Sequence, residues 1–140
     1  MPSPNALLAG TNAAEFPSTA QPSVLVVDDS DTIRKFVTFA LRARDLRVVT
    51  ARDGLEALEK FAADPTDLVI TDLNMPGLDG YGLVQAFRGE SDTADLPIIV
   101  LSSLSSDEDV QRAIDLGADA YLVKPFDPKR IQYEVAKHLN

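Results

Sequence analysis

The chain of 140 residues contains no cysteine and no tryptophan, and it has a single histidine. Without cysteine, the protein cannot form a disulfide, build a thiolate metal site or use a thiol in catalysis. No stretch approaches the roughly 20 apolar residues that are needed to cross a membrane. The amino terminus also lacks the charged start and apolar core of a secretory signal. These absences predict a cytoplasmic protein that makes no contact with a membrane.

Positive charge is also scarce. Thirteen lysine and arginine residues stand against 22 aspartate and glutamate residues, which gives a formal net charge of −9. Because binding to nucleic acid requires basic surface that displaces counterions, we expect no nucleic-acid partner. Acidity could simply favour solubility. That explanation does not account for the acidic residues that directly follow the first and third apolar runs of the chain.

The chain divides into a short leader and one larger unit. Residues 1–22 are rich in Ala, Ser, Thr, Asn and Pro and show no sustained hydrophobic period. We expect them to form a flexible leader. Residues 23–140 alternate short apolar runs with helical patterns throughout, and their length is sufficient for a single core. They are therefore expected to form one domain.

Five strand–helix units follow one another in residues 23–140, and this succession predicts a parallel sheet with helices on both faces. The runs at 24–27, 68–70 and 98–101 are apolar without alternation, as is typical of central strands. The run at 47–50 has polar neighbours, which favours an edge position. The predicted fold is a flavodoxin-like, doubly wound α/β sheet of five strands in the order 2-1-3-4-5, with five helices.

Helical spacing of apolar residues places the five helices near residues 33–41, 55–62, 83–87, 110–117 and 131–139. In the second helix, Leu55, Leu58 and Phe61 are expected to form the buried stripe. Ser105 and Glu108 have the spacing of a capping box, which predicts the start of the fourth helix.

Charged or hydroxyl-bearing residues stand where the apolar runs end. They are Asp28, Asp29, Asp72, Ser102 and Lys124. The carboxyl ends of parallel strands meet at one edge of the sheet, where ligands bind in open α/β folds. Carboxylates, a hydroxyl and an ammonium at one edge can hold a hard cation and a phosphoryl group side by side.

The three aspartates are most informative as a group. Each alone could cap a helix or begin a turn. Together, carboxylates about 4 Å apart repel by roughly 4 kcal/mol per pair at an effective dielectric near 20. A cation or a shared proton is therefore required. Oxygen ligands without His or Cys select Mg²⁺, Mn²⁺ or Ca²⁺, and so few protein ligands favour Mg²⁺, with Mn²⁺ as an alternative.

Lys124 and Ser102 are the candidates for contacting a phosphoryl group. Lys124 directly follows the apolar run at 121–123, although a surface lysine would read the same in isolation. Pro125 restricts Lys124 to extended conformations, and we expect a cis peptide bond that directs the side chain. Ser102 is the serine at the end of the fourth run, so we favour it over its neighbours. A simple loop or capping hydroxyl is the alternative.

The segment Asp72-Leu-Asn-Met-Pro-Gly-Leu-Asp-Gly80 makes the pattern specific. Together with the acidic pair, the serine-ended fourth strand, Gly117-Ala-Asp-Ala-Tyr121 and Lys124-Pro-Phe126, it resembles the response-regulator receiver domain of two-component signalling. The resemblance covers about residues 23–140. It implies a phosphorylation-activated switch that acts as a signalling protein and not as a dedicated enzyme.

The resemblance also implies roles for individual residues. Asp72 would accept a phosphoryl group from the phosphohistidine of a sensor histidine kinase or a histidine phosphotransfer protein. Ser102 would serve both as a phosphoryl contact and, with Tyr121, as the switch. The resemblance implies that Mg²⁺ is bound by Asp29, Asp72 and the backbone carbonyl of Asn74, and by Asp28 through water. Lys124 would contact the phosphoryl group. Pro76, Gly80 and a cis Pro125 would have structural roles.

The output is implied to be protein contact with a downstream target, through a face formed by the fourth helix, fifth strand and fifth helix. Residues 29–35 resemble chemotaxis-type or motility-type single-domain regulators. A phosphorelay shuttle and a receiver from a larger regulator stay open as alternatives. A Mg²⁺-dependent phosphatase with an aspartyl nucleophile would have a second acid at the position of Asn74. A flavodoxin-type electron carrier would need an anion-binding loop where Asp28 and Asp29 stand.

Overall fold

The computed structural model of the protein describes residues 21–139. The predicted flexible leader, residues 1–22, lies outside the described residues except for Gln21 and Pro22. Within residues 21–139 there are five strands, five α-helices and one short 3₁₀ helix. Their bounds are β2 Ser23–Val27, α1 Asp31–Arg42, β3 Arg47–Ala51, α2 Gly54–Ala63, β4 Leu68–Thr71, α3 Gly80–Arg88, η2 Ser91–Thr93, β5 Ile98–Ser102, α4 Asp107–Leu116, β6 Ala120–Val123 and α5 Pro128–Leu139.

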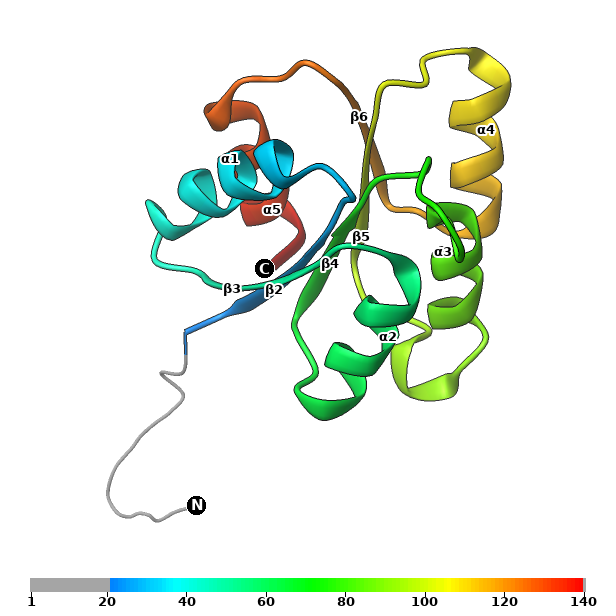
Figure 1. The fold of residues 1–140 in the computed structure, drawn as a ribbon, viewed down its shortest axis with the longest axis horizontal. Helices are drawn as coiled ribbons and strands as arrows, with labels where there is room; N and C mark the ends of the chain where they lie inside the picture. The colour runs from blue at the N-terminus through cyan, green and yellow to red at the C-terminus, as the bar shows by residue number, and fades with distance from the viewer. Residues whose placement is uncertain (1–20, 140) are drawn as a thin grey trace.

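The five strands form one parallel sheet in the order β3-β2-β4-β5-β6. In chain order this is 2-1-3-4-5, so the predicted topology is confirmed, and the second strand lies at the edge. Helices α1 and α5 cover one face, and α2, α3 and α4 cover the other (Figure 1). The chain reverses its direction of winding between β2 and β4, and the carboxyl ends of strands at such a point are where ligands bind in open α/β sheets.

The strand sequences explain why the sheet has two covered faces. Every residue of β2, β4 and β5 is buried. Alternate residues of β4 enter different cores: Ile70 packs with α1 and α5, whereas Val69 packs with α2 and α3. Burying one such side chain contributes about 1.5–3 kcal/mol. The uninterrupted apolar runs are therefore what fixes the central position of these strands.

Two details of the helices differ from prediction. Helix α4 is capped by Ser106, whose Oγ accepts a hydrogen bond from the backbone N–H of Asp109 at 3.1 Å. The predicted capping pair of Ser105 and Glu108 is therefore wrong by one residue. Leu55 was expected in the buried stripe of α2, but it is 63% exposed.

Gly80 allows helix α3 to begin close to Asp72, at the end of the sheet where the predicted site lies. It is the first residue of α3, and a Cβ placed there would collide with the backbone carbonyl oxygen of Asp72. The Gly80 N–H also donates to the carbonyl of Leu73 at 3.0 Å. Glycine thus lets the start of α3 pack directly against the backbone that follows β4.

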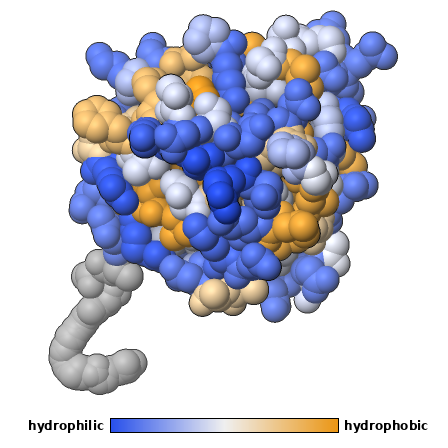
Figure 2. Space-filling model, in the orientation of Figure 1, coloured by the Kyte–Doolittle hydropathy of each residue, from blue (hydrophilic) through white to orange (hydrophobic). Residues whose placement is uncertain are grey.

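The surface is mixed in character. Figure 2 shows polar side chains over most of the visible face, with apolar side chains in separate patches. None of the described helices has the length and apolar character that a membrane crossing requires.

Candidate functional site

Three carboxylates meet at the carboxyl edge of the sheet. Asp28 and Asp29 follow β2, and Asp72 directly follows β4, which is paired with β2 so that Val27 lies beside Thr71. One carboxylate oxygen of each aspartate lies within 4.8 Å of those of the other two. Asp28 and Asp72 are buried, while Asp29 is exposed. The structure therefore brings together the three acids that the sequence analysis singled out.

Backbone hydrogen bonds fix two of these carboxylates. The Asp72 Oδ1 accepts from the N–H of Leu73 at 2.8 Å, and the Asp28 Oδ1 accepts from the N–H of Ser30 at 2.9 Å. The Asp72 N–H donates to the carbonyl of Val27 at 2.9 Å, which continues the sheet past the end of β4. Each buried acid thus keeps one oxygen for contacts within the site.

Lys124, which directly follows the edge strand β6, contacts two of the acids. Its Nζ lies 2.9 Å from Asp28 Oδ2 and 3.4 Å from Asp72 Oδ2. The backbone N–H of Lys124 donates to the carbonyl of Ser102 at 2.8 Å, which anchors the start of its loop to β5. The bond between Lys124 and Pro125 is cis, the conformation expected from the sequence.

The charges at this edge do not balance. Three carboxylates and one ammonium leave two negative charges uncompensated. Burial raises the pKa of the Asp72 carboxyl, and the negative charge of Asp28 raises it further, whereas Lys124 opposes both effects. The ionised form of Asp72 is thus penalised until more positive charge arrives.

The donor set fits a hard divalent cation. All three side chains offer oxygen, two are buried and preoriented, and the missing charge is that of one divalent ion. Oxygen ligands of this kind select Mg²⁺ or Mn²⁺ over softer metals. The carbonyl of Asn74 stays a predicted ligand. Asn74 is an exposed residue between the buried Leu73 and Met75, two positions after Asp72.

Pro76 and Gly77 complete the turn after Asn74. Pro76 is exposed, and Gly77 has φ +75°, in the left-handed region that glycine adopts without strain. This turn follows the buried Met75, which packs into the core below. The loop that carries Asn74 is therefore anchored on both sides of the exposed residue.

Ser102 and Tyr121 are connected through the loop that follows β5. The Oγ of Ser102, which is fully buried, accepts from the Leu104 N–H at 3.1 Å. The Tyr121 hydroxyl donates to the Leu104 carbonyl at 2.7 Å. Burial raises the pKa of the Tyr121 phenol, so the hydroxyl keeps its proton for this bond at neutral pH. Both predicted switch residues thus bind the backbone of the same loop residue.

The side chain of Leu104 packs inward. It is half-buried and lies against a cluster that includes Leu73, Val100 and Ala113. The loop after β5 therefore packs against the same cluster that contains Leu73, the residue next to Asp72.

Arg34 belongs to the site, although its place in the sequence does not predict this. Its Nη1 donates to the backbone carbonyl of Asp28 at 2.6 Å, and its Nη2 lies 3.1 Å from Asp31. Only 14% of the side chain is exposed. Arg34 thereby holds the backbone that presents Asp28 and Asp29. The only hint of this role in the sequence is that an arginine follows the acidic pair within the next helix. An arginine at such a position usually lies in solvent.

Comparison with known proteins agrees with this geometry. Residues 24–136 match the family model described as the response regulator receiver domain. The chain is 44% identical over 112 residues to the probable transcriptional regulator ycf27 of Porphyridium aerugineum, covering 80% of this chain and 45% of that protein. It is 43% identical over 110 residues to the gliding motility regulatory protein of Myxococcus xanthus, covering 79% of this chain and 14% of that protein. The chain thus spans less than half the length of these curated relatives.

Solved structures give the same result over most of this chain. The chemotaxis protein CheY4 of Vibrio cholerae superposes with a TM-score of 0.81 at 38% identity, covering 86% of this chain and 100% of that one. A putative response regulator from Chloroflexus aurantiacus superposes with a TM-score of 0.82 at 33% identity, covering 86% and 98% of the two chains.

Proposed function

Since the chain belongs to the response regulator receiver domain family, we propose that it is a signalling switch activated by phosphorylation of Asp72. The observation that supports this most directly is the set of three carboxylates within 4.8 Å, two of them in contact with Lys124. An acidic pocket with one ammonium suits phosphoryl transfer, in which positioning and charge neutralisation dominate.

The proposed donor is a phosphohistidine on a sensor histidine kinase or a histidine phosphotransfer protein. An oxygen of the Asp72 carboxylate forms a bond to phosphorus while the phosphorus–nitrogen bond breaks, and the bonding electron pair returns to the imidazole. Asp72 must be ionised to act as the nucleophile. Lys124 favours that ionised form, and its ammonium can also contact the oxygens of the entering group.

Asp28, Asp29 and Asp72 would hold Mg²⁺, with the backbone carbonyl of Asn74 as a further ligand. When bound, the ion would neutralise the carboxylates and the oxygens of the transferring group. Arg34 acts beside it as a positioning residue, because it holds the backbone carbonyl of Asp28.

The proposed response begins at Ser102. Phosphorylation adds charge and acceptor oxygens beside the end of β4. Leu104, in the loop after β5, is hydrogen-bonded to both Ser102 and Tyr121. If the Ser102 hydroxyl turns to donate to the phosphoryl oxygens, this loop must change its conformation. The surface of α4, β6 and α5 would change with that loop and engage a downstream target. The extent of the change is limited by how differently the phosphoryl group interacts with the two conformations.

Labelling with acetyl phosphate tests this proposal. We expect the purified protein to acquire a phosphoryl group in the presence of Mg²⁺ and to remain unlabelled when EDTA removes the metal. Hydroxylamine should release the label, since it cleaves acyl phosphates and leaves phosphate esters intact. A label that forms equally in EDTA, or one that resists hydroxylamine, would contradict the proposal.

The output takes one of two proposed forms. A single-domain regulator of chemotaxis or motility type is favoured by the structural match to CheY4, which covers 86% of this chain and 100% of that one. A receiver that acts within a longer regulator is favoured by the relatives named as transcriptional regulators, of which the chain covers 45%. A pull-down with and without beryllofluoride, which mimics the aspartyl phosphate, separates them. The first form requires a protein partner that is retained only in the activated state.

A further inference from the structure

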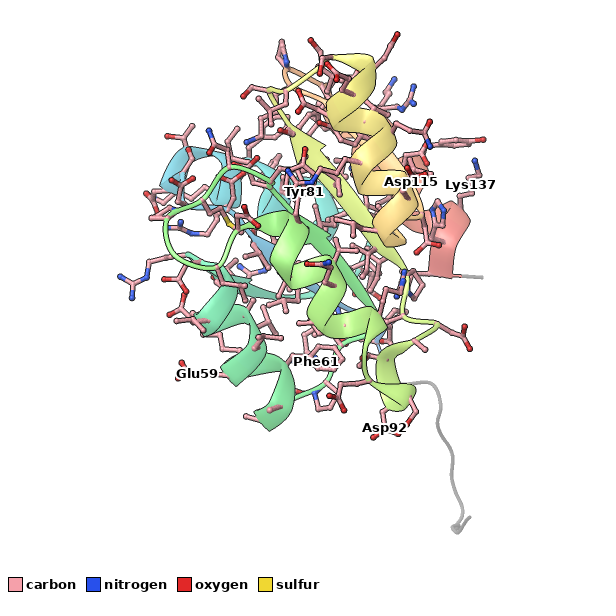
Figure 3. All side chains as sticks on the ribbon, turned by 90° about the vertical axis from the view of Figure 1, so that its right-hand side faces the viewer. Glu59, Phe61, Tyr81, Asp92, Asp115 and Lys137 are labelled. Carbon is pink, nitrogen blue, oxygen red and sulfur yellow. The ribbon has the colours of Figure 1, made fainter. Side chains whose placement is uncertain are left out.

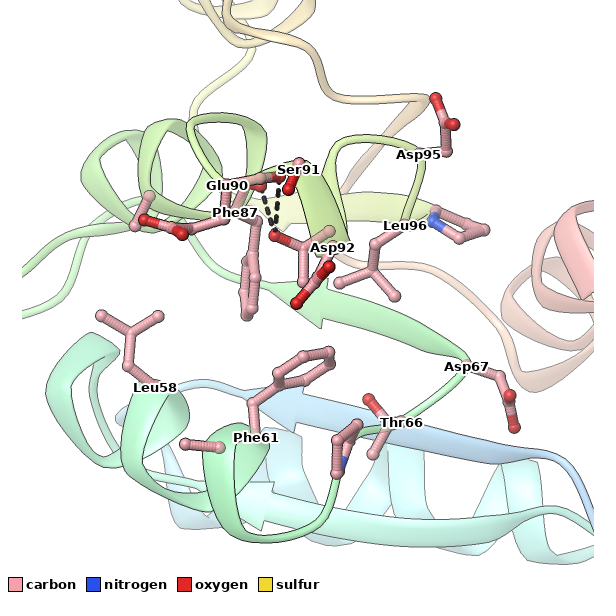
Figure 4. A pocket seen from close by; sticks show the side chains of 15 residues that line it. Leu58, Phe61, Thr66, Asp67, Phe87, Glu90, Ser91, Asp92, Asp95 and Leu96 are labelled. Carbon is pink, nitrogen blue, oxygen red and sulfur yellow. Dashed lines mark hydrogen bonds between the residues drawn. The ribbon is translucent and has the colours of Figure 1, made fainter.

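A groove of about 680 Å³ opens between α2 and the segment that connects α3 to β5 (Figure 4). Its floor is apolar and includes Leu58, Phe61, Phe87 and Leu96. The rings of Phe61 and Phe87 meet edge to face, with their centroids 5.0 Å apart. The volume lies within the range of about 300–1,000 Å³ that is typical of ligand pockets.

The rim of the groove is negatively charged. Asp67, Glu90, Asp92 and Asp95 line it and are exposed, and none of the fifteen lining residues is Lys, Arg or His. Within residues 21–139, none of these four acids forms an ion pair. Other exposed acids, such as Asp31 and Asp64, do have basic partners. Asp67 differs from the other three acids, because its Oδ2 accepts hydrogen bonds from Ser23 and its charge acts on Arg47. Arg88 also reaches the groove, where its Nη1 donates to the carbonyls of Thr93 and Leu96. The unpaired negative charge of the rim is therefore that of Glu90, Asp92 and Asp95.

The groove lies at the amino-terminal ends of β4 and β5, whereas Asp72 lies at the carboxyl end of β4. Asp67 immediately precedes β4, and Leu96 lies just before β5, whereas Asp72 and Ser102 stand at the other ends of these strands. Four residues of β4 span about 13 Å. Figure 3 likewise shows Phe61 and Asp92 in the lower part of the molecule, away from Tyr81 near the start of α3. Phosphoryl transfer as proposed above uses no residue of this groove.

We propose that the groove docks a segment of a partner protein in which a large apolar side chain is flanked by lysine or arginine. The apolar side chain would leave water for the half-buried side chains of Leu58, Phe61 and Leu96. The basic residues would meet the acidic rim, which steers cationic partners and disfavours acidic ones. Nucleic acid and anionic lipid lack this complementarity, because both present negative charge.

The protein itself is a poor occupant of the groove. Residues 1–20 contain no lysine or arginine, so they cannot match the acidic rim. A second copy of the chain carries a net charge of −9, which opposes self-association at an acidic surface. Both observations favour a separate, basic partner.

A titration of the ¹⁵N-labelled full chain with four synthetic hexapeptides tests the proposal. The peptides carry either Phe-Leu or Ser-Ser at the centre, flanked on both sides by two lysines or by two glutamates. We expect only the peptide with Phe-Leu and lysine to give saturable amide shifts, confined to residues such as Ala62, Glu90 and Leu96. The same affinity is expected with and without Mg²⁺ and beryllofluoride, so failure of the phosphorylation site leaves this test intact.

Paired variants distinguish the groove from general acidity. Asp92→Asn together with Asp95→Asn should weaken binding of the Phe-Leu lysine peptide by about tenfold. Asp107→Asn together with Glu108→Gln removes the same charge from the exposed first turn of α4 and should leave the affinity unchanged.

Several results would overturn the proposal. These are no binding by any of the four peptides, equal binding by the Ser-Ser lysine peptide, or equal weakening by the two double variants. Groove amides that shift with protein concentration alone would identify a second copy as the occupant. Groove amides that shift in a Leu7→Ser, Leu8→Ser variant without peptide would identify the leader instead.

Discussion

Replacing Asp72 with asparagine is expected to abolish labelling by acetyl phosphate, a loss of at least about 100-fold. The amide is nearly the same size as the carboxyl, but it is not a nucleophile. The fold should be preserved, because the side-chain oxygen of asparagine can still accept the hydrogen bond from Leu73. Burial and the charge of Asp28 raise the pKa of Asp72, so a neutral amide also removes an electrostatic penalty in the absence of metal.

The measurement is the incorporation of radioactive phosphate in the presence of Mg²⁺, with folding checked by circular dichroism. Asp92→Asn is the matched control, since it makes the same chemical change at an exposed acid on the opposite edge of the sheet, and it should label normally. Undiminished labelling of the Asp72→Asn protein would exclude Asp72 as the acceptor.

Lys124→Ala is expected to separate metal binding from switching. The variant keeps the three carboxylates, so Mg²⁺ should still bind, and its affinity should rise because a competing ammonium is gone. The response to beryllofluoride should be lost, since no ammonium remains to contact the phosphoryl oxygens. Without metal, the free energy of unfolding of the variant should be lower by about 3 kcal/mol, because Asp28 and Asp72 lose the ammonium that they contact.

Amide shifts of Leu104 and Tyr121 upon addition of Mg²⁺ and beryllofluoride provide the measurement. Lys129→Ala is the control, because Lys129 is exposed near the start of α5 and should respond as the unmodified protein does. If the Lys124→Ala protein showed the full set of activated shifts, the role assigned to Lys124 would be wrong.

The fold and the acidic cluster could be predicted because both depend on local patterns. Strands buried on two faces need unbroken apolar runs, such as those of β2 and β4, and these runs are visible in the sequence. Once the strands are parallel neighbours, the residues that follow them must meet at one edge. Asp28, Asp29 and Asp72 are therefore placed together by topology alone.

Features that depend on tertiary packing could not be predicted. Ser105 with Glu108 and Ser106 with Asp109 have the same spacing, and only the folded loop after β5 decides that Ser106 caps α4. In α2 the buried stripe begins at Gly54 and not at Leu55, because a Cβ at Gly54 would collide with Leu78. The contact between Arg34 and the carbonyl of Asp28, and the acidic groove before β4 and β5, likewise require the assembled fold.

The most direct test is to locate the phosphoryl group after labelling. Borohydride reduces an aspartyl phosphate to homoserine, and peptide mass mapping then identifies the modified position. We predict homoserine at position 72 and nowhere else in the chain. Homoserine at position 28 or 29, or a stable phosphate ester with no homoserine at all, would contradict a metal-assisted transfer to Asp72.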